Sequence, residues 1–165
     1  INEDRKEEAE SLMQEALRLE PGQPDLLNNL AGIYSQQGRT NESTAIIEEL
    51  FAKHPDYFFA RTNLANIYIQ RGMLDEAAEL LPPLLGLEKY HVSEMRALCQ
   101  TEINLAIAQK KTDVAQSWIQ MWESFDKDDP QLEYWKRRIH AGDAPGSLST
   151  LLGQIQKWPS RRKRK

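Results

Sequence analysis

Short sequence patterns recur in this chain at an interval of 34 residues. The tripeptide Asn-Leu-Ala occupies residues 29–31 and again residues 63–65, and Gly38 is followed by Gly72 at the same distance. A fixed period between about 20 and 50 residues indicates an array of structural repeats, each of which buries its apolar face only against its neighbours. The period therefore predicts a stacked fold in which one type of unit is used several times.

Within each period the apolar residues have helical spacing, which predicts pairs of helices. The first pair is expected at residues 25–37 and 41–53, and the second at residues 61–71 and from residue 74 onward. Gly38 and Gly72 stand where a helix end needs a left-handed residue, and Asn41 is predicted to cap the next helix. The residues expected on the packing faces of the first pair are Leu27, Leu30, Ala31 and Tyr34, then Ile46, Ile47, Leu50 and Phe51.

These units resemble the tetratricopeptide repeat (TPR), a two-helix unit with characteristic apolar and small residues. Residues 24–57 match at Leu27-x2-Leu30-Ala31-x2-Tyr34, Ser43-x3-Ile47 and Pro55, and residues 58–91 match at Leu64-Ala65-x2-Tyr68 and Ala77-x3-Leu81. Residues 1–23 match only the second helix of a preceding unit. The resemblance implies an all-α fold, a right-handed superhelix of antiparallel helix pairs.

Three features of the second unit depart from the family pattern, and one of them is Lys89 in place of the closing proline. Arg61 stands where the pattern has a large apolar residue, and Pro82 and Pro83 lie inside the predicted second helix. A proline inside a helix removes a hydrogen-bond donor and clashes with the preceding turn. We expect a break at residues 81–83, with Leu84, Leu85 and Leu87 still packed inward.

Beyond residue 91 the 34-residue phase is lost, and a divergent pair is predicted over residues 92–129, with helices at 93–110 and 113–125. Closing helices are predicted over residues 130–158, the first capped by Asp129. The last is a C-terminal capping helix that seals the array with a stripe of Leu148, Leu151, Leu152 and Ile155. Residues 159–165 form a basic tail.

Composition argues against catalysis and against a membrane span. No apolar run reaches the roughly 18 residues that a spanning helix needs, and we expect a cytoplasmic protein. The three histidines are far apart in sequence, and the single cysteine, Cys99, is expected to be a small buried hydrophobe. No spacing suggests a catalytic site, a metal site or a cofactor site, so we expect a protein that is not an enzyme.

The resemblance also implies where a ligand binds, because the first helix of each unit lines a concave groove in this family. The implied partner is a protein or peptide, and asparagine amides can exchange hydrogen bonds with its backbone. Asn29 and Asn63 occupy a position at which the family commonly has asparagine, so a scaffolding role remains the alternative to ligand contact. The residues expected to line this peptide-binding groove are Asn28, Asn29, Gln36, Phe59, Asn63, Asn66 and Gln70.

Three further hypotheses remain open. The chain could be the accessory TPR portion of a larger enzyme whose catalytic domain lies elsewhere. It could self-associate through the apolar stripe Leu12, Met13, Ala16 and Leu17 of the half repeat. The tail could bind nucleic acid, an anionic membrane or a transport receptor, or be a solvated terminus. The net charge is −4, and −9 without the five cations of residues 161–165, so the body is acidic and no specific nucleic-acid binding is expected.

Overall fold

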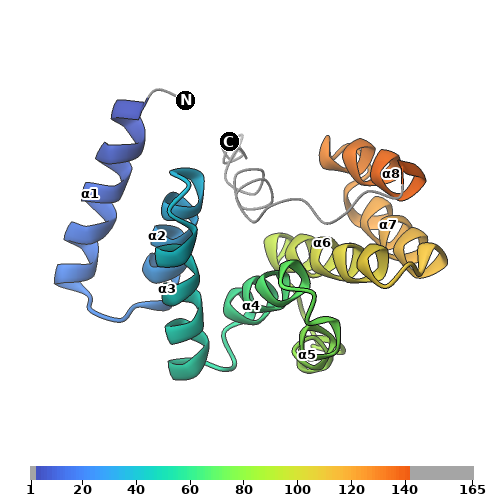
Figure 1. The fold of residues 1–165 in the computed structure, drawn as a ribbon, viewed down its shortest axis with the longest axis horizontal. Helices are drawn as coiled ribbons and strands as arrows, with labels where there is room; N and C mark the ends of the chain where they lie inside the picture. Colours follow the sequence, from blue (N-terminus) through green and yellow to red (C-terminus); the bar gives the residue numbers. More distant parts are fainter. Residues whose placement is uncertain (1–2, 142–165) are drawn as a thin grey trace. The chain divides into compact units, whose positions relative to one another are not determined.

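The computed structural model describes residues 3–141, and every regular element in this range is helical (Figure 1). The chain divides between Ile47 and Glu48 into two compact units, and each is described by itself. The first contains α1 (Glu3–Leu19), α2 (Pro24–Gln36) and the first half of α3 (Thr40–Lys53). The predicted all-α class is confirmed for the described range.

In the first unit, α1 and α2 are packed together and α3 is joined to α2. The hydroxyl of Ser43 donates to the carbonyl of Ala31 at 2.8 Å. Glu10 on α1 accepts hydrogen bonds from Gln37 and Arg39, each at 2.9 Å. Because these bonds hold α1 beside the end of α2, its predicted apolar stripe is only partly exposed. Leu12 is 57% exposed, whereas the other three residues of the stripe are half-buried.

The helix ends at Gly38, Gly72 and Lys110 have the same geometry. Their φ angles are +78°, +75° and +59°, and the residue after each donates to the carbonyl five positions back at 2.8–2.9 Å. This pattern is a Schellman motif, which satisfies carbonyls that the helix end would otherwise leave unbonded. The predicted stops at Gly38 and Gly72 are confirmed. Lys110 is a third stop, in which a lysine takes the left-handed conformation.

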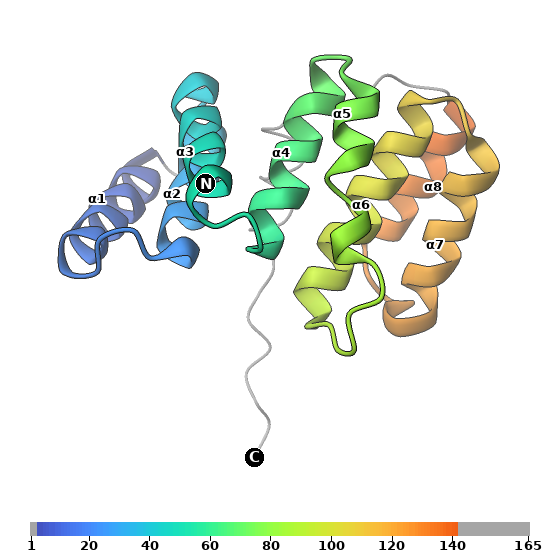
Figure 2. The same cartoon turned by 90° about the horizontal axis from the view of Figure 1, so that it is seen from below.

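The second unit contains the rest of α3, then α4 (Phe58–Gln70), α5 (Leu74–Glu79), α6 (Val92–Ala108), α7 (Thr112–Asp126) and α8 (Gln131–Ala141). Figure 2 shows α4 to α8 side by side as an antiparallel array. The predicted third pair and the helix after Asp129 are confirmed with bounds shifted by one or two residues. Residues 142–165, with the predicted capping helix and basic tail, lie outside the described range.

The 34-residue period predicts where these helices start more accurately than the local residue types do. The starts of α2, α4 and α6, at Pro24, Phe58 and Val92, are 34 residues apart, so α4 begins before the predicted Arg61. The prediction that Asn41 caps α3 is wrong. The helix begins at Thr40, and Ser43 already donates its N–H to the Arg39 carbonyl at 3.1 Å. Asn41 therefore lies inside the first turn.

The predicted proline break is confirmed. The helix α5 ends at Glu79 and is followed by a 3-10 turn, η1 (Pro82–Leu84). Leu84 is 3% exposed, as predicted, but Leu85 and Leu87 are 47% and 44% exposed, so the prediction is wrong for these two leucines. The backbone becomes extended at Leu85 and turns at Gly86, whose φ is +80°, and this path carries both side chains away from the core.

Two tryptophans form the centre of the core in the second unit. Trp122 on α7 and Trp135 on α8 have no exposed surface. Trp122 donates through Nε1 to Asp129 Oδ2 at 3.2 Å, and Asp129 Oδ1 accepts from the N–H of Gln131 at 2.9 Å. Asp129 thus caps α8, as predicted. The predicted apolar face of α7 is buried only in part, since its Val114 is 37% exposed.

Candidate peptide-binding surface

On α2 the predicted groove residues are accessible. Asn29 is exposed, and Asn28 and Gln36 are half-buried. The helix that carries them begins at Pro24, and the Gln23 side chain accepts a hydrogen bond from the N–H of Leu26 at 2.7 Å. This cap fixes the start of α2 and therefore which residues face outward. In the first unit the three amides remain candidates for contact with a ligand.

On α4 the corresponding residues are more enclosed. Asn63 and Asn66 are 6% and 8% exposed, whereas Phe59 and Gln70 are half-buried. Asn29 and Asn63 hold the same position in successive repeats, but the first is exposed and the second is buried. The difference arises in the second unit itself, where α6 packs directly against α4.

The Asn66 amide is occupied by intramolecular partners. Its Nδ2 donates to Thr101 Oγ1 at 2.8 Å and to the Thr62 carbonyl at 2.9 Å. Its Oδ1 accepts from Asn104 Nδ2 at 3.0 Å, and Asn104 Oδ1 accepts from Arg138 Nη1 at 2.9 Å. These bonds form a buried polar chain from α4 through α6 to α8. The sequence did not predict that Thr101, Asn104 and Arg138 belong to this chain of hydrogen bonds, because no repeat pattern links them to Asn66.

The aromatic residues at the start of α4 pack on one another. Phe58 and Phe59 meet edge to face with ring centroids 5.9 Å apart, and Tyr57 lies 5.8 Å from Phe59 in a similar arrangement. Phe58 is buried and also contacts Tyr90 at 6.3 Å. Phe59 is therefore a half-buried member of a packed cluster.

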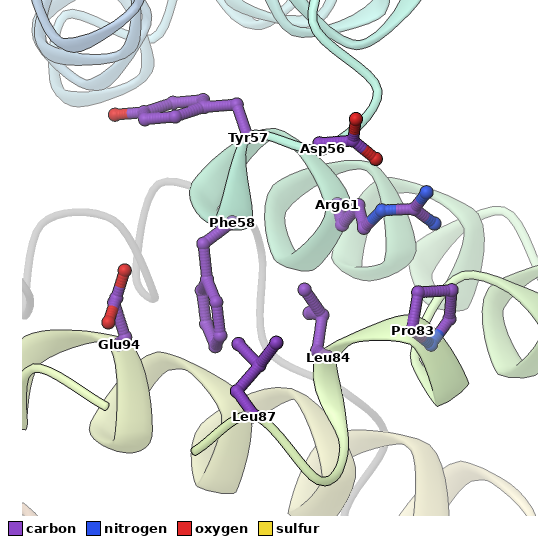
Figure 3. A pocket seen from close by; sticks show the side chains of 8 residues that line it. All are labelled: Asp56, Tyr57, Phe58, Arg61, Pro83, Leu84, Leu87 and Glu94. Atoms are coloured by element: carbon purple, nitrogen blue, oxygen red, sulfur yellow. The ribbon is translucent and has the colours of Figure 1, made fainter. Parts of the chain in front are cut away.

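A pocket of about 460 Å³ opens beside this cluster (Figure 3). It lies wholly in the second unit, between the start of α4, the segment after α5 and the first turn of α6. Its lining combines apolar side chains with two acids and one arginine: Asp56, Tyr57, Phe58, Arg61, Pro83, Leu84, Leu87 and Glu94. Figure 3 shows Phe58, Leu84 and Leu87 converging between Glu94 on one side and Asp56 with Arg61 on the other. No feature of the sequence predicted this hollow.

Burial shifts the pKa values of three ionisable groups in the second unit. Burial raises the pKa of the Cys99 thiol to about 12, and its side chain has no exposed surface. Burial also raises the pKa values of Glu102 and Asp129 above their ordinary range. The prediction that Cys99 is a buried hydrophobe is confirmed. Over residues 3–141, no group of three His, Cys, Asp or Glu side chains is placed to hold a metal ion.

Comparison with known proteins agrees with the helix-pair architecture. A family model described as tetratricopeptide repeat matches residues 3–58, which hold α1, α2, α3 and the first residue of α4. No curated protein and no solved structure gives a significant match. Within the described range no helix is long and apolar enough to cross a membrane. Tetratricopeptide repeats generally mediate protein–protein interaction and typically form non-catalytic scaffolds. The matched segment, residues 3–58, is similar to the tetratricopeptide repeat family, and the all-helical architecture of the described residues agrees with this similarity.

Proposed function

We propose that this chain is a non-catalytic interaction module that binds a peptide or helix along the first helices of its repeats. The observation that carries the proposal is the exposed Asn29 on α2, with Asn28 and Gln36 half-buried on the same helix. On α4, Phe59 and Gln70 are the accessible members of the predicted set. Asn66 serves the internal network and is left out of the proposed contact surface.

The chemistry of this surface suits an extended backbone. An asparagine side chain offers two donors and an acceptor, which match the alternating C=O and N–H groups of a peptide. Such contacts provide affinity with little selection of ligand side chains. Selectivity would then come from apolar contacts, for which the half-buried ring of Phe59 is the candidate on α4.

A displayed library of random peptides, selected on the full chain, supplies probes for the test. The affinity of a selected peptide is measured for the wild type and for Asn29→Ala, with Asn41→Ala as matched control. Asn41 is also an exposed asparagine in the same unit, but it lies in the first turn of α3. We expect Asn29→Ala to weaken binding about fivefold or more and Asn41→Ala to leave it unchanged. Equal effects of the two substitutions would refute the assignment to α2.

We also propose self-association through α1, on the narrower basis of Leu12, which is 57% exposed. Leu12 shares a helical stripe with the half-buried Met13, Ala16 and Leu17, and contiguous apolar surface favours burial against another chain. Sedimentation equilibrium of the wild type and of Leu12→Glu tests it. A concentration-dependent mass that the substitution abolishes is expected, and a monomer at all concentrations would contradict it.

A further inference from the structure

We propose that the pocket at the start of α4 is a second docking site, for a partner segment that carries an apolar side chain flanked by lysine or arginine. The site is separate from the amides of α2 and does not depend on their role. Two departures of the second repeat from the family pattern, Arg61 and Pro83 of the proline pair, line this pocket.

The pocket exists because the second helix of this repeat is cut short. The helix α3 has 14 residues, whereas α5, which starts 34 residues after it, has only six. An α5 as long as α3 would continue to residue 87. Pro82 and Pro83 instead direct the chain into η1, and the lining residues Pro83, Leu84 and Leu87 come from this diverted segment.

The diverted segment is held in place by Tyr90. Its hydroxyl donates to the Leu84 carbonyl at 2.7 Å and accepts from the N–H of Leu87 at 3.2 Å. Its ring also meets Phe58 edge to face. The apolar wall is therefore formed before any ligand arrives, which lowers the entropic cost of binding. Because Leu87 is still 44% exposed, a ligand's apolar side chain would gain by covering it.

The charges around the wall favour a cationic partner. Asp56 and Glu94 lie on opposite sides of the apolar residues (Figure 3), and among the described residues neither forms an ion pair. One oxygen of Glu94 accepts from the N–H of His91 at 2.7 Å to cap α6, which leaves the other for a ligand. The guanidinium of Arg61 is held over the Phe51 ring, 5.5 Å from its centroid, and donates to the Leu80 carbonyl at 3.4 Å.

Three labelled peptides of equal length test the proposal by fluorescence anisotropy on the full chain at low salt. The first has a central leucine flanked by lysines, the second has glutamates in place of the lysines, and the third keeps the lysines around a central glycine. We expect the first to bind at least about tenfold more tightly than either of the others. Raising the salt concentration should weaken its binding, because Asp56 is exposed to solvent and Glu94 is only half-buried.

Two pocket variants and a matched control locate the binding. Leu87→Ala should weaken the lysine–leucine peptide about tenfold, since it removes apolar surface that the ligand would cover. Leu85→Ala is the control, because Leu85 is equally exposed and two residues away but does not line the pocket. The double change Asp56→Asn with Glu94→Gln should weaken binding about five- to tenfold and flatten the salt dependence. Glutamine at position 94 can still cap α6, so the fold is kept.

The proposal is overturned if the glutamate peptide binds as tightly as the lysine peptide, since Arg61 would then be the charge that selects the ligand. Equal losses in Leu85→Ala and Leu87→Ala would also overturn it, as would the absence of binding at millimolar protein. Asn29→Ala should leave these peptides unaffected. Failure of the α2 surface and failure of this pocket are thereby distinguished.

Discussion

Asn104 donates a hydrogen bond through Nδ2 to Oδ1 of Asn66 at 3.0 Å, and this bond joins α6 to α4 across 38 residues of sequence. Both side chains are buried, and Asn104 also accepts from the buried Arg138. The bond is one of the contacts by which α6 packs against α4, on which Asn66 is buried. It also gives the second unit a polar connection between successive first helices.

The cost of breaking this connection is the first prediction. Asn104→Ala should lower the free energy of unfolding by about 2–3 kcal/mol, because it leaves polar groups of Asn66 and Arg138 buried without that partner. Urea denaturation measures the change, and Asn66→Ala with the double variant completes a cycle. We expect the double variant to lose less than the sum of the single losses. Strict additivity would mean that the two amides are not energetically coupled.

The left-handed lysine at the end of α6 gives a second prediction. Lys110 has a φ of +59°, whereas the two equivalent helix stops use glycine. Lys110→Gly should therefore stabilise the chain by about 1 kcal/mol, since glycine takes this conformation without steric cost. Lys111→Gly is the matched control, because Lys111 has a φ of −99° and therefore has no left-handed strain to relieve. A destabilised Lys110→Gly variant would contradict the assignment of this stop.

Glu102 links stability to pH, and this is the third prediction. Burial raises its pKa in the folded chain above the ordinary value of 4.5. Since the folded chain then holds the proton more tightly than the unfolded chain, stability is lost as pH rises from below 4.5 through the folded value. Glu102→Gln removes this loss. Urea denaturation at pH 4 and pH 7 should show that the substitution stabilises the chain more at pH 7. A larger gain at pH 4 would contradict the direction of the shift.

The proline break can be reversed, which gives the fourth prediction. Replacing Pro82 and Pro83 with alanine restores two backbone donors and removes two clashes, so α5 should extend toward Leu87. Circular dichroism should show more helix, and the lysine–leucine peptide should lose affinity as the diverted wall is withdrawn. Pro130→Ala, at an exposed proline just before α8, is the control and should change neither. A gain of helix without a loss of binding would show that the peptide site does not depend on the proline break.

Apolar spacing within each 34-residue repeat predicted the helix pairs well, because the pattern of one helix depends only on residues near one another in the sequence. The positions of glycine and proline predicted the helix stops and the break. Even the start of α4 at Phe58, which local residues misplaced, lies one period after Pro24. The wrong cap at Asn41 shows the opposite case, since a residue type favourable at a cap was read without the backbone bond that starts the turn at Arg39.

Exposure could not be predicted from the period, because it depends on which neighbour covers a face. Asn29 and Asn63 have the same phase, yet only the second is buried. The same limit applies to the pocket. In the sequence, Arg61 and the proline pair are separate departures from the family pattern. Only in the folded chain do Leu87 and Phe58 line the same pocket, where the N–H of Leu87 donates a hydrogen bond to the Tyr90 hydroxyl.

The central claim is that α2 presents its accessible amides to a bound peptide. Photo-crosslinking tests it most directly: benzoylphenylalanine is placed at position 29 or, as control, at position 41, and each variant is irradiated with a labelled peptide selected on the wild type. Position 29 lies on the proposed surface, and position 41 is also exposed but lies on α3. We predict efficient crosslinking from position 29 that excess unlabelled peptide suppresses, and none from position 41. Crosslinking from position 41 alone, or equal yields from both positions, would contradict the account.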